Sequence, residues 1–104
     1  MVRIPTDRAP THPGEMLFEE FVRPLGTNAA AIATALRVPP EWIDELIERR
    51  RSVTPSLALR LARLLGTSPD FWLNLQMRWD LYRVQNEERV AIDQIQQLPI
   101  RLAS

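Results

Sequence analysis

The sequence predicts an all-α fold, a single domain of five short helices with a C-terminal extension. Three observations support this prediction. Apolar residues recur three and four positions apart, no segment alternates like a strand, and most of the nine prolines stand where a helix would begin. With 104 residues, 45% of them hydrophobic, the chain has room for one core but hardly for two. We expect a flexible arm over residues 1–11, the helical domain over 12–85 and the extension over 86–104.

The first third of the chain is expected to contain the arm and two helices. Residues 1–11 hold two prolines among polar residues without periodicity, which is typical of an arm. A first helix is expected to begin at Pro13 and to end before Pro24. The second is expected over Ala29–Leu36, an alanine-rich stretch for which Asn28 is a good N-cap.

The third helix is expected to begin at Pro40, about three residues after the second one ends. Its apolar residues follow at helical spacing and are Trp42, Ile43, Leu46 and Ile47. Because neighbouring side chains on a helix point about 100° apart, Trp42 and Ile43 cannot both face the core, and we expect Trp42 to be partly exposed. Two short helices joined by so small a turn match the helix-turn-helix motif, in which the first helix supports the second against DNA.

The last two helices begin with the same signal, a hydroxyl cap followed by proline. Thr54 and Pro55 open the fourth helix, and Ser68 and Pro69 open the fifth. The side chains expected to form the core stripe of the fourth helix are Leu57, Leu61, Leu64 and Leu65. Those expected to face the core or a dimer interface in the fifth are Phe71, Trp72, Leu75, Trp79 and Tyr82.

Composition excludes several classes of protein. Because there is no cysteine and only one histidine, His12, thiol nucleophiles, zinc sites and nucleophile-base pairs lack their usual residues. We therefore expect a protein that is not an enzyme and that needs no metal or cofactor. No apolar stretch reaches the roughly 20 residues that span a bilayer, so we expect a cytoplasmic protein with no membrane partner. Thirteen basic residues balance thirteen acidic ones, so any DNA-binding charge must be local.

Seven short motifs carry a family resemblance. They are THPGEML (11–17), EEF (19–21), PLG (24–26), RSVTP (51–55), ALRLA (58–62), LGTSP (65–69) and FWLNLQ (71–76). Together they resemble the HigA (VapI-type) antitoxins over about residues 11–83. The resemblance implies an XRE or lambda-repressor-like fold, a homodimer, and binding to double-stranded operator DNA as a transcriptional autorepressor. It also implies neutralisation of a HigB-type toxin that cleaves messenger RNA.

The helix-turn-helix segment departs from that family's pattern. Residues 40–42 read Pro-Glu-Trp where the family commonly has small polar residues or arginine, and Asp44 stands where it often has asparagine. Arginine replaces the usual glycine at two positions, Arg37 in the turn and Arg49 before the following loop. The fold implied by the resemblance does not depend on these positions, but the DNA contacts do.

The charges around the third helix support two interpretations. Its carboxylates are Glu41, Asp44, Glu45 and Glu48, and together they repel phosphates, although one can accept a hydrogen bond from cytosine N4. Four arginines flank the helix, Arg37, Arg49, Arg50 and Arg51, and these are suited to hold the DNA backbone. Alternatively, the arginines of the loop pair with Glu45 and Glu48 on a solvated surface.

Two functional hypotheses follow. In the first, the chain is a dimeric DNA-binding antitoxin that contacts phosphates or bases through Asn28, Arg37, Glu41, Trp42, Asp44, Arg49, Arg50, Arg51 and Thr54. In the second, it is a protein-interaction module of the same fold, whose acidic third helix binds a basic partner such as the toxin and not DNA.

Overall fold

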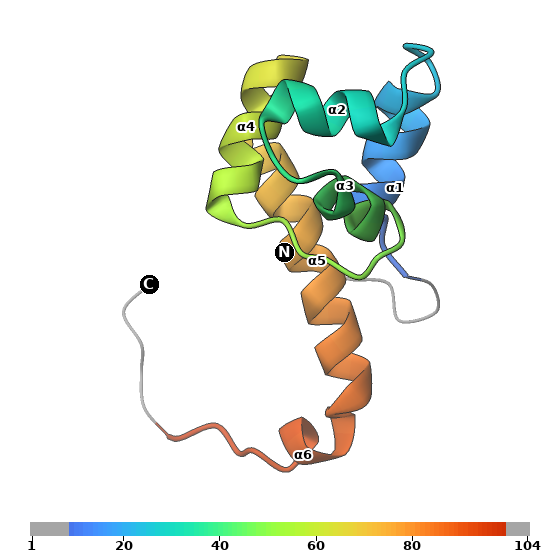
Figure 1. Cartoon of the computed structure of the whole chain (residues 1–104). Coiled ribbons are helices and arrows are strands. Elements are labelled where there is room, and N and C mark those ends of the chain that lie inside the picture. Colours follow the sequence, from blue (N-terminus) through green and yellow to red (C-terminus); the bar gives the residue numbers. More distant parts are fainter. Residues whose placement is uncertain (1–8, 100–104) are drawn as a thin grey trace.

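In the computed structural model, residues 9–99 are described and form helices joined by short loops, with no strand among them (Figure 1). The helices are α1 (Pro13–Leu17), α2 (Ala29–Leu36), α3 (Pro40–Ile47), α4 (Pro55–Leu65), α5 (Pro69–Glu87) and α6 (Arg89–Asp93), and a π-helical turn, η1 (Phe18–Val22), continues α1. The predicted all-α fold is confirmed, with α1 and η1 as its first helix. Most of the predicted arm over residues 1–11 lies outside the described residues.

Local capping signals set where the helices begin. The side chains of Asn28, Thr54 and Ser68 accept hydrogen bonds from first-turn N–H groups of α2, α4 and α5, at 2.9, 3.2 and 3.1 Å. Proline occupies the start of α3, α4 and α5, where its missing N–H breaks no helical hydrogen bond. The predicted starts of these helices are confirmed.

The first helix lies unusually close to α3 because Gly14 faces the backbone of α3. A Cβ atom at residue 14 would overlap the carbonyl oxygen of Leu46 and would lie 2.9 Å from the Cα atom of Ile47. His12 fixes the start of α1, since its Nδ1 atom accepts a hydrogen bond from the Gly14 N–H at 2.9 Å. His12 is therefore the N-cap residue of α1.

One apolar core joins α1, η1, α2, α3, α4 and α5, and it includes the indole of Trp72. Its buried members are Leu17, Val22, Ile32, Ala33, Leu36, Ile43, Leu46, Val53, Leu57, Ala58, Leu61 and Trp72. The Trp72 ring is 0% exposed and meets the ring of Phe71 edge to face at 5.1 Å, while Phe21 lies 5.8 Å away. Its Nε1–H donates to the hydroxyl of Thr67 at 2.7 Å, so the one polar atom of the indole is satisfied.

One predicted core residue is exposed. Leu64 in α4 has 39% of its surface accessible, so its assignment to the core stripe was wrong. Ala58 and Ala62 complete the buried face of α4 instead, which moves the centre of that face away from Leu64. Leu64 lines an open groove between α4 and α2.

The C-terminal half of α5 extends beyond the other helices, and α6 lies at its far end (Figure 1). Because α5 continues to Glu87, the predicted boundary at residue 85 falls inside a helix, and the division into three parts stays a prediction. Several large apolar side chains of this region are exposed, among them Met77, Leu81, Val90 and Ile95. Such a surface is suited to contact with another protein chain.

Candidate nucleic-acid interface

Helices α2 and α3 form a helix-turn-helix unit whose turn is residues 37–39. Arg37 ends α2 in the left-handed region, with φ 60°, and the N–H of Val38 donates to the carbonyl oxygen of Ala33 at 3.1 Å. Arg49, after α3, has φ 64°. Both arginines thus occupy left-handed backbone positions, the conformation that glycine adopts without a Cβ clash. These are the two positions where the family resemblance leads one to expect glycine.

Replacing Arg37 by glycine is expected to increase the free energy of unfolding by about 0.5 to 1 kcal/mol, because relief of left-handed strain exceeds the entropic cost of glycine. Urea denaturation measures the change. Arg63→Gly is the matched control: it removes an exposed arginine from the last turn of α4, where the backbone is helical, and should destabilise the chain by up to about 1 kcal/mol. A loss of stability in Arg37→Gly would instead assign a stabilising contact to the Arg37 side chain.

The outer surface of α3 carries three of the predicted contact residues. Glu41 and Asp44 are exposed, and Trp42 is half-buried beside the fully buried Ile43. The expected partial exposure of Trp42 is confirmed. This surface therefore presents two carboxylates and part of an indole to whatever α3 meets.

Asn28 and Thr54 are exposed residues at the N-terminal ends of α2 and α4. Their side-chain oxygens serve as caps, which leaves the Asn28 amide N–H groups and the Thr54 hydroxyl hydrogen available as donors. The free N–H groups and the dipole of a helix N-terminus favour an anion. Contact of Asn28 and Thr54 with a phosphate stays a prediction.

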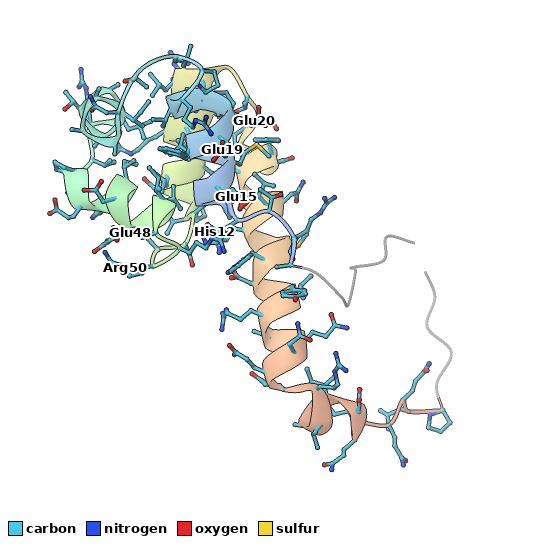
Figure 2. The ribbon with its side chains drawn as sticks, turned by 90° about the vertical axis from the view of Figure 1, so that its right-hand side faces the viewer. His12, Glu15, Glu19, Glu20, Glu48 and Arg50 are labelled. Carbon is cyan, nitrogen blue, oxygen red and sulfur yellow. The ribbon has the colours of Figure 1, made fainter. Side chains whose placement is uncertain are left out.

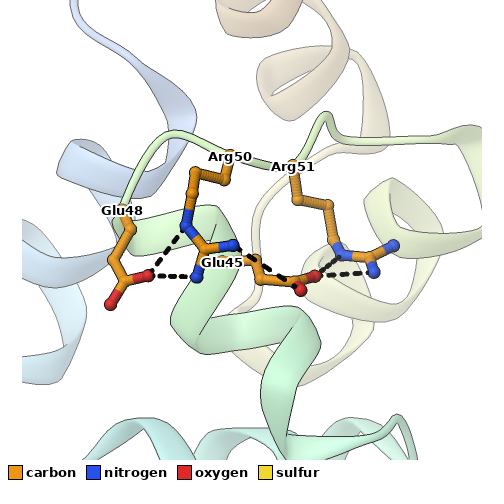
Figure 3. Close-up of polar contacts among 4 residues, drawn as sticks. All are labelled: Glu45, Glu48, Arg50 and Arg51. Carbon is orange, nitrogen blue, oxygen red and sulfur yellow. Dashed lines mark hydrogen bonds and ion pairs between the residues drawn. The ribbon is translucent and has the colours of Figure 1, made fainter.

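The loop after α3 carries three arginines in a row, and two of them pair with carboxylates of α3 and its C-terminal end (Figure 3). Arg51 Nη2 lies 2.7 Å from Glu45 Oε1, and Arg50 Nη1 lies 3.9 Å from Glu45 Oε2. Arg50 also donates to Glu48 through Nε, at 3.1 Å, and through Nη2. The alternative interpretation, surface pairing of these arginines with Glu45 and Glu48, is confirmed for Arg50 and Arg51. The hydrogen bonds that Arg50 donates to Glu48, together with the negative charge of that carboxylate, raise the pKa of Arg50.

Arg49 has a different partner. Its Nη2 atom lies 2.8 Å from Glu15 Oε1 on α1, and its guanidinium carbon lies 5.4 Å from the ring centre of Trp79 on α5. Arg51 makes a similar contact with Trp42, at 4.7 Å. Arg50 and Arg51 are therefore tied to α3 and its C-terminal end, whereas Arg49 is tied to α1 and α5.

Two further arginines near the turn were not among the predicted contacts. Arg60 of α4 donates from Nη1 to the carbonyl oxygen of Leu36, at 2.8 Å, and so lies beside Arg37. Arg63 lines the groove between α2 and α4 together with both. The sequence signal for this basic surface is that residues 49–69 contain five arginines and no aspartate or glutamate.

Within residues 9–99, no helix combines the length and the apolar character needed to cross a membrane. Side chains that could bind a metal together do not occur in groups of three or more in this part of the chain.

Comparison with known proteins gives consistent relatives, although no family model matches the chain. Virulence-associated protein I of Dichelobacter nodosus is 41% identical over 75% of this chain and 72% of its own length. Antitoxin HigA-1 of Vibrio cholerae is 40% identical over 78% of this chain and 76% of its own. The solved structure of antitoxin GraA in complex with its operator is 39% identical, with a TM-score of 0.82 over 89% of this chain and 95% of that one.

The agreement in sequence with HigA-1 extends over 81 residues, and the agreement in structure with GraA covers most of both chains. Similarity of this extent, at about 40% identity, establishes common ancestry as well as a common fold. This chain belongs to the HigA family of helix-turn-helix antitoxins.

Proposed function

We propose that this chain is an antitoxin of a type II toxin-antitoxin system that acts in the cytoplasm, binds its operator as a dimeric autorepressor and neutralises a HigB-type toxin. Its role is binding and not catalysis. The observation that carries the proposal is the helix-turn-helix itself, because the outer surface of α3 is uncovered and the arginine loop follows directly at its C-terminal end. Because this chain is related to GraA, the structure of GraA in complex with its operator supports the proposal that this chain binds DNA.

The proposed contacts divide into two kinds. Glu41, Trp42 and Asp44 on α3 read base edges, where a carboxylate accepts from cytosine N4 and an indole meets a thymine methyl group. Backbone phosphates are held by Asn28, Arg37, Arg49, Arg50, Arg51 and Thr54. To bind a phosphate, Arg50 must break its ion pair with Glu48, so that a phosphate oxygen replaces a carboxylate oxygen as its partner.

The pairing of the arginine loop also favours a second candidate, a protein-interaction module. Because Glu45 and Glu48 neutralise part of the charge of Arg50 and Arg51, the surface around α3 is less basic than its arginine count indicates. Glu15, Glu19 and Glu20 add carboxylates on α1 and η1 (Figure 2), of which Glu15 and Glu19 are themselves paired with Arg49 and Arg23. A basic toxin would be attracted to these carboxylates.

The test is a titration of the chain against the duplex upstream of its own gene, at two salt concentrations. Arg50→Ala is expected to weaken binding about equally for operator and random duplex, and to reduce the magnitude of the salt slope by about one. Arg89→Ala on α6 is the control and should change neither the affinity for DNA nor the salt slope. Absence of any binding by the unmodified chain would refute the DNA-binding proposal.

A double substitution separates the two candidates. Replacing Glu41 and Asp44 by glutamine and asparagine removes two charges that phosphates repel, so affinity for all duplexes should rise, while preference for the operator should fall. If the double variant instead loses affinity for the toxin and neither it nor the unmodified chain binds DNA, then α3 is a protein-docking surface.

We expect the chain to be a dimer at micromolar concentration. The exposed side of α5 forms a shallow apolar hollow of about 430 Å³ that includes Leu73, Met77 and Leu81, and a second copy would cover it. A twofold dimer presents its two α3 helices to successive major grooves, about 34 Å apart, and so requires a palindromic site. Light scattering is expected to give twice the chain mass for the unmodified protein and a monomer for Leu81→Arg. A monomer mass for the unmodified protein would contradict this expectation.

A further inference from the structure

A second hollow lies between the arginine loop, the start of α1 and the side of α5, with a volume of about 280 Å³. Four arginines line it, Arg49, Arg50 and Arg51 from the loop and Arg83 from α5. Asp80 is the one acidic residue among the described residues that line it. The walls therefore carry four guanidinium groups and one carboxylate. Each guanidinium is ion-paired, so the hollow can attract an anion through N–H groups that the ion pairs leave unused, and not through a large net charge.

The His12 ring is held in this wall with a defined tautomer. It is 2% exposed, and its Nδ1 atom accepts the hydrogen bond from Gly14. Burial, followed by the charge of Arg49, lowers the pKa of His12, so the ring is neutral near pH 7. In a neutral ring whose Nδ1 is an acceptor, the proton is on Nε2, and this atom is a hydrogen-bond donor.

Each arginine has N–H groups that its ion pair does not use. A guanidinium has five N–H groups, and each of these ion pairs uses only some of them. Arg49 uses Nη2 for Glu15, and Arg83 uses Nη1 for Glu87, at 3.2 Å. Neither Glu15 nor Glu87 lines the hollow, but Asp80 does, and its Oδ1 atom lies 4.0 Å from Arg83 Nη2. The carboxylates of Glu15 and Glu87 hold the two arginine side chains in place and leave the remaining N–H groups for a ligand.

Aromatic contacts make this wall rigid. The ring of Trp79 lies 4.9 Å from the ring of His12, at an interplanar angle of 85°, and the guanidinium of Arg49 lies over the same indole. Three elements separated in sequence thus supply one surface. A surface positioned in this way loses little side-chain entropy when a ligand binds.

We propose that this hollow binds a single phosphate-type oxyanion. Such a ligand offers acceptors on every side, and donors of Arg49, Arg83, His12 and Ser52 surround the hollow. The ligand is either a free phosphate or one phosphate of a DNA backbone, which present the same oxygens. His12 and Arg83 lie outside the helix-turn-helix, so the site can fail while the proposed operator binding holds.

The experiment titrates inorganic phosphate into the unmodified chain at an ionic strength held constant with chloride, and follows the His12 ring and the Trp79 indole N–H by NMR. Both signals are expected to shift and to saturate. Arg83→Gln should weaken the apparent phosphate affinity about tenfold, the usual effect of losing one charge-assisted hydrogen bond. Arg89→Gln removes the same charge from α6, outside the hollow, and should leave the affinity unchanged.

A parallel titration with operator duplex identifies the source of the ligand. Two results would show that the site holds a backbone phosphate: the duplex abolishes the response to free phosphate, or the duplex shifts the two signals although free phosphate does not. In either case, Arg83→Gln must weaken the effect of the duplex. If the chain bound to the duplex still responds to inorganic phosphate, the site holds a free anion. The proposal is overturned if neither ligand gives a saturable shift, or if Arg89→Gln has the same effect as Arg83→Gln.

Discussion

Replacing Trp72 by alanine is expected to lower the free energy of unfolding by about 3 to 5 kcal/mol, the usual cost of removing a buried large aromatic side chain. The indole is fully buried in the apolar core, so its loss leaves a cavity that the surrounding side chains cannot close. The Thr67 hydroxyl also loses the N–H that donates to it. Urea denaturation followed by circular dichroism gives the value.

Two further variants make this prediction specific. Leu59→Ala removes an apolar side chain that is 61% exposed on α4, and it should cost less than about 1 kcal/mol. Trp72→Phe keeps an aromatic ring in the core and should cost less than the alanine variant, which allows a measurement if the latter does not fold. An unchanged stability of Trp72→Ala would show that the indole is not part of the core.

Replacing Gly14 by alanine is expected to cost about 3 kcal/mol, the upper end of the usual range for overpacking. The added methyl group would overlap the backbone of α3 at Leu46, and a backbone carbonyl cannot rotate away as a side chain can. Either α1 or α3 must move, so the pairing of Glu15 with Arg49 should weaken as well. Thermal and urea denaturation measure the cost.

Gly66→Ala is the matched control for this substitution. Gly66 has φ 74° and open space around its Cβ position, so alanine there meets backbone strain of about 1 to 2 kcal/mol but no clash. The difference between the two variants isolates the contact between α1 and α3. If Gly14→Ala costs no more than Gly66→Ala, the two helices do not depend on this close approach.

The helices could be predicted from sequence because their signals are local. A hydroxyl or amide cap and a proline act within one turn, which is why the starts of α2, α4 and α5 agree with expectation. The exposure of Leu64 could not be predicted in this way. The exposure of Leu64 depends on how much of α4 is covered by α2, and packing between segments remote in sequence sets this coverage.

In the candidate site, too, contacts between residues close in sequence could be predicted and contacts between remote residues could not. Pairing of Arg50 and Arg51 with Glu45 and Glu48 joins residues within six positions and was among the expected alternatives. The pair of Arg49 with Glu15 spans 34 positions, and its prediction requires the close approach of α1 to α3. The left-handed backbone at Arg37 and Arg49 agrees with the glycines that the family resemblance places there, and composition alone gives no sign of it. Which of the nine candidate residues touch DNA stays a prediction.

The carboxylates beside the arginine loop bear on how the protein is distributed in a cell. Glu45 and Glu48 compete with every phosphate for Arg50 and Arg51, whatever the base sequence, so they lower the affinity for random duplex. A genome offers on the order of a million or more such random sites, and these would otherwise retain most copies of a more basic protein. A chain that carries its own competing anions leaves a larger share of its copies off the chromosome. On the proposed function, these copies are the ones that intercept newly made toxin.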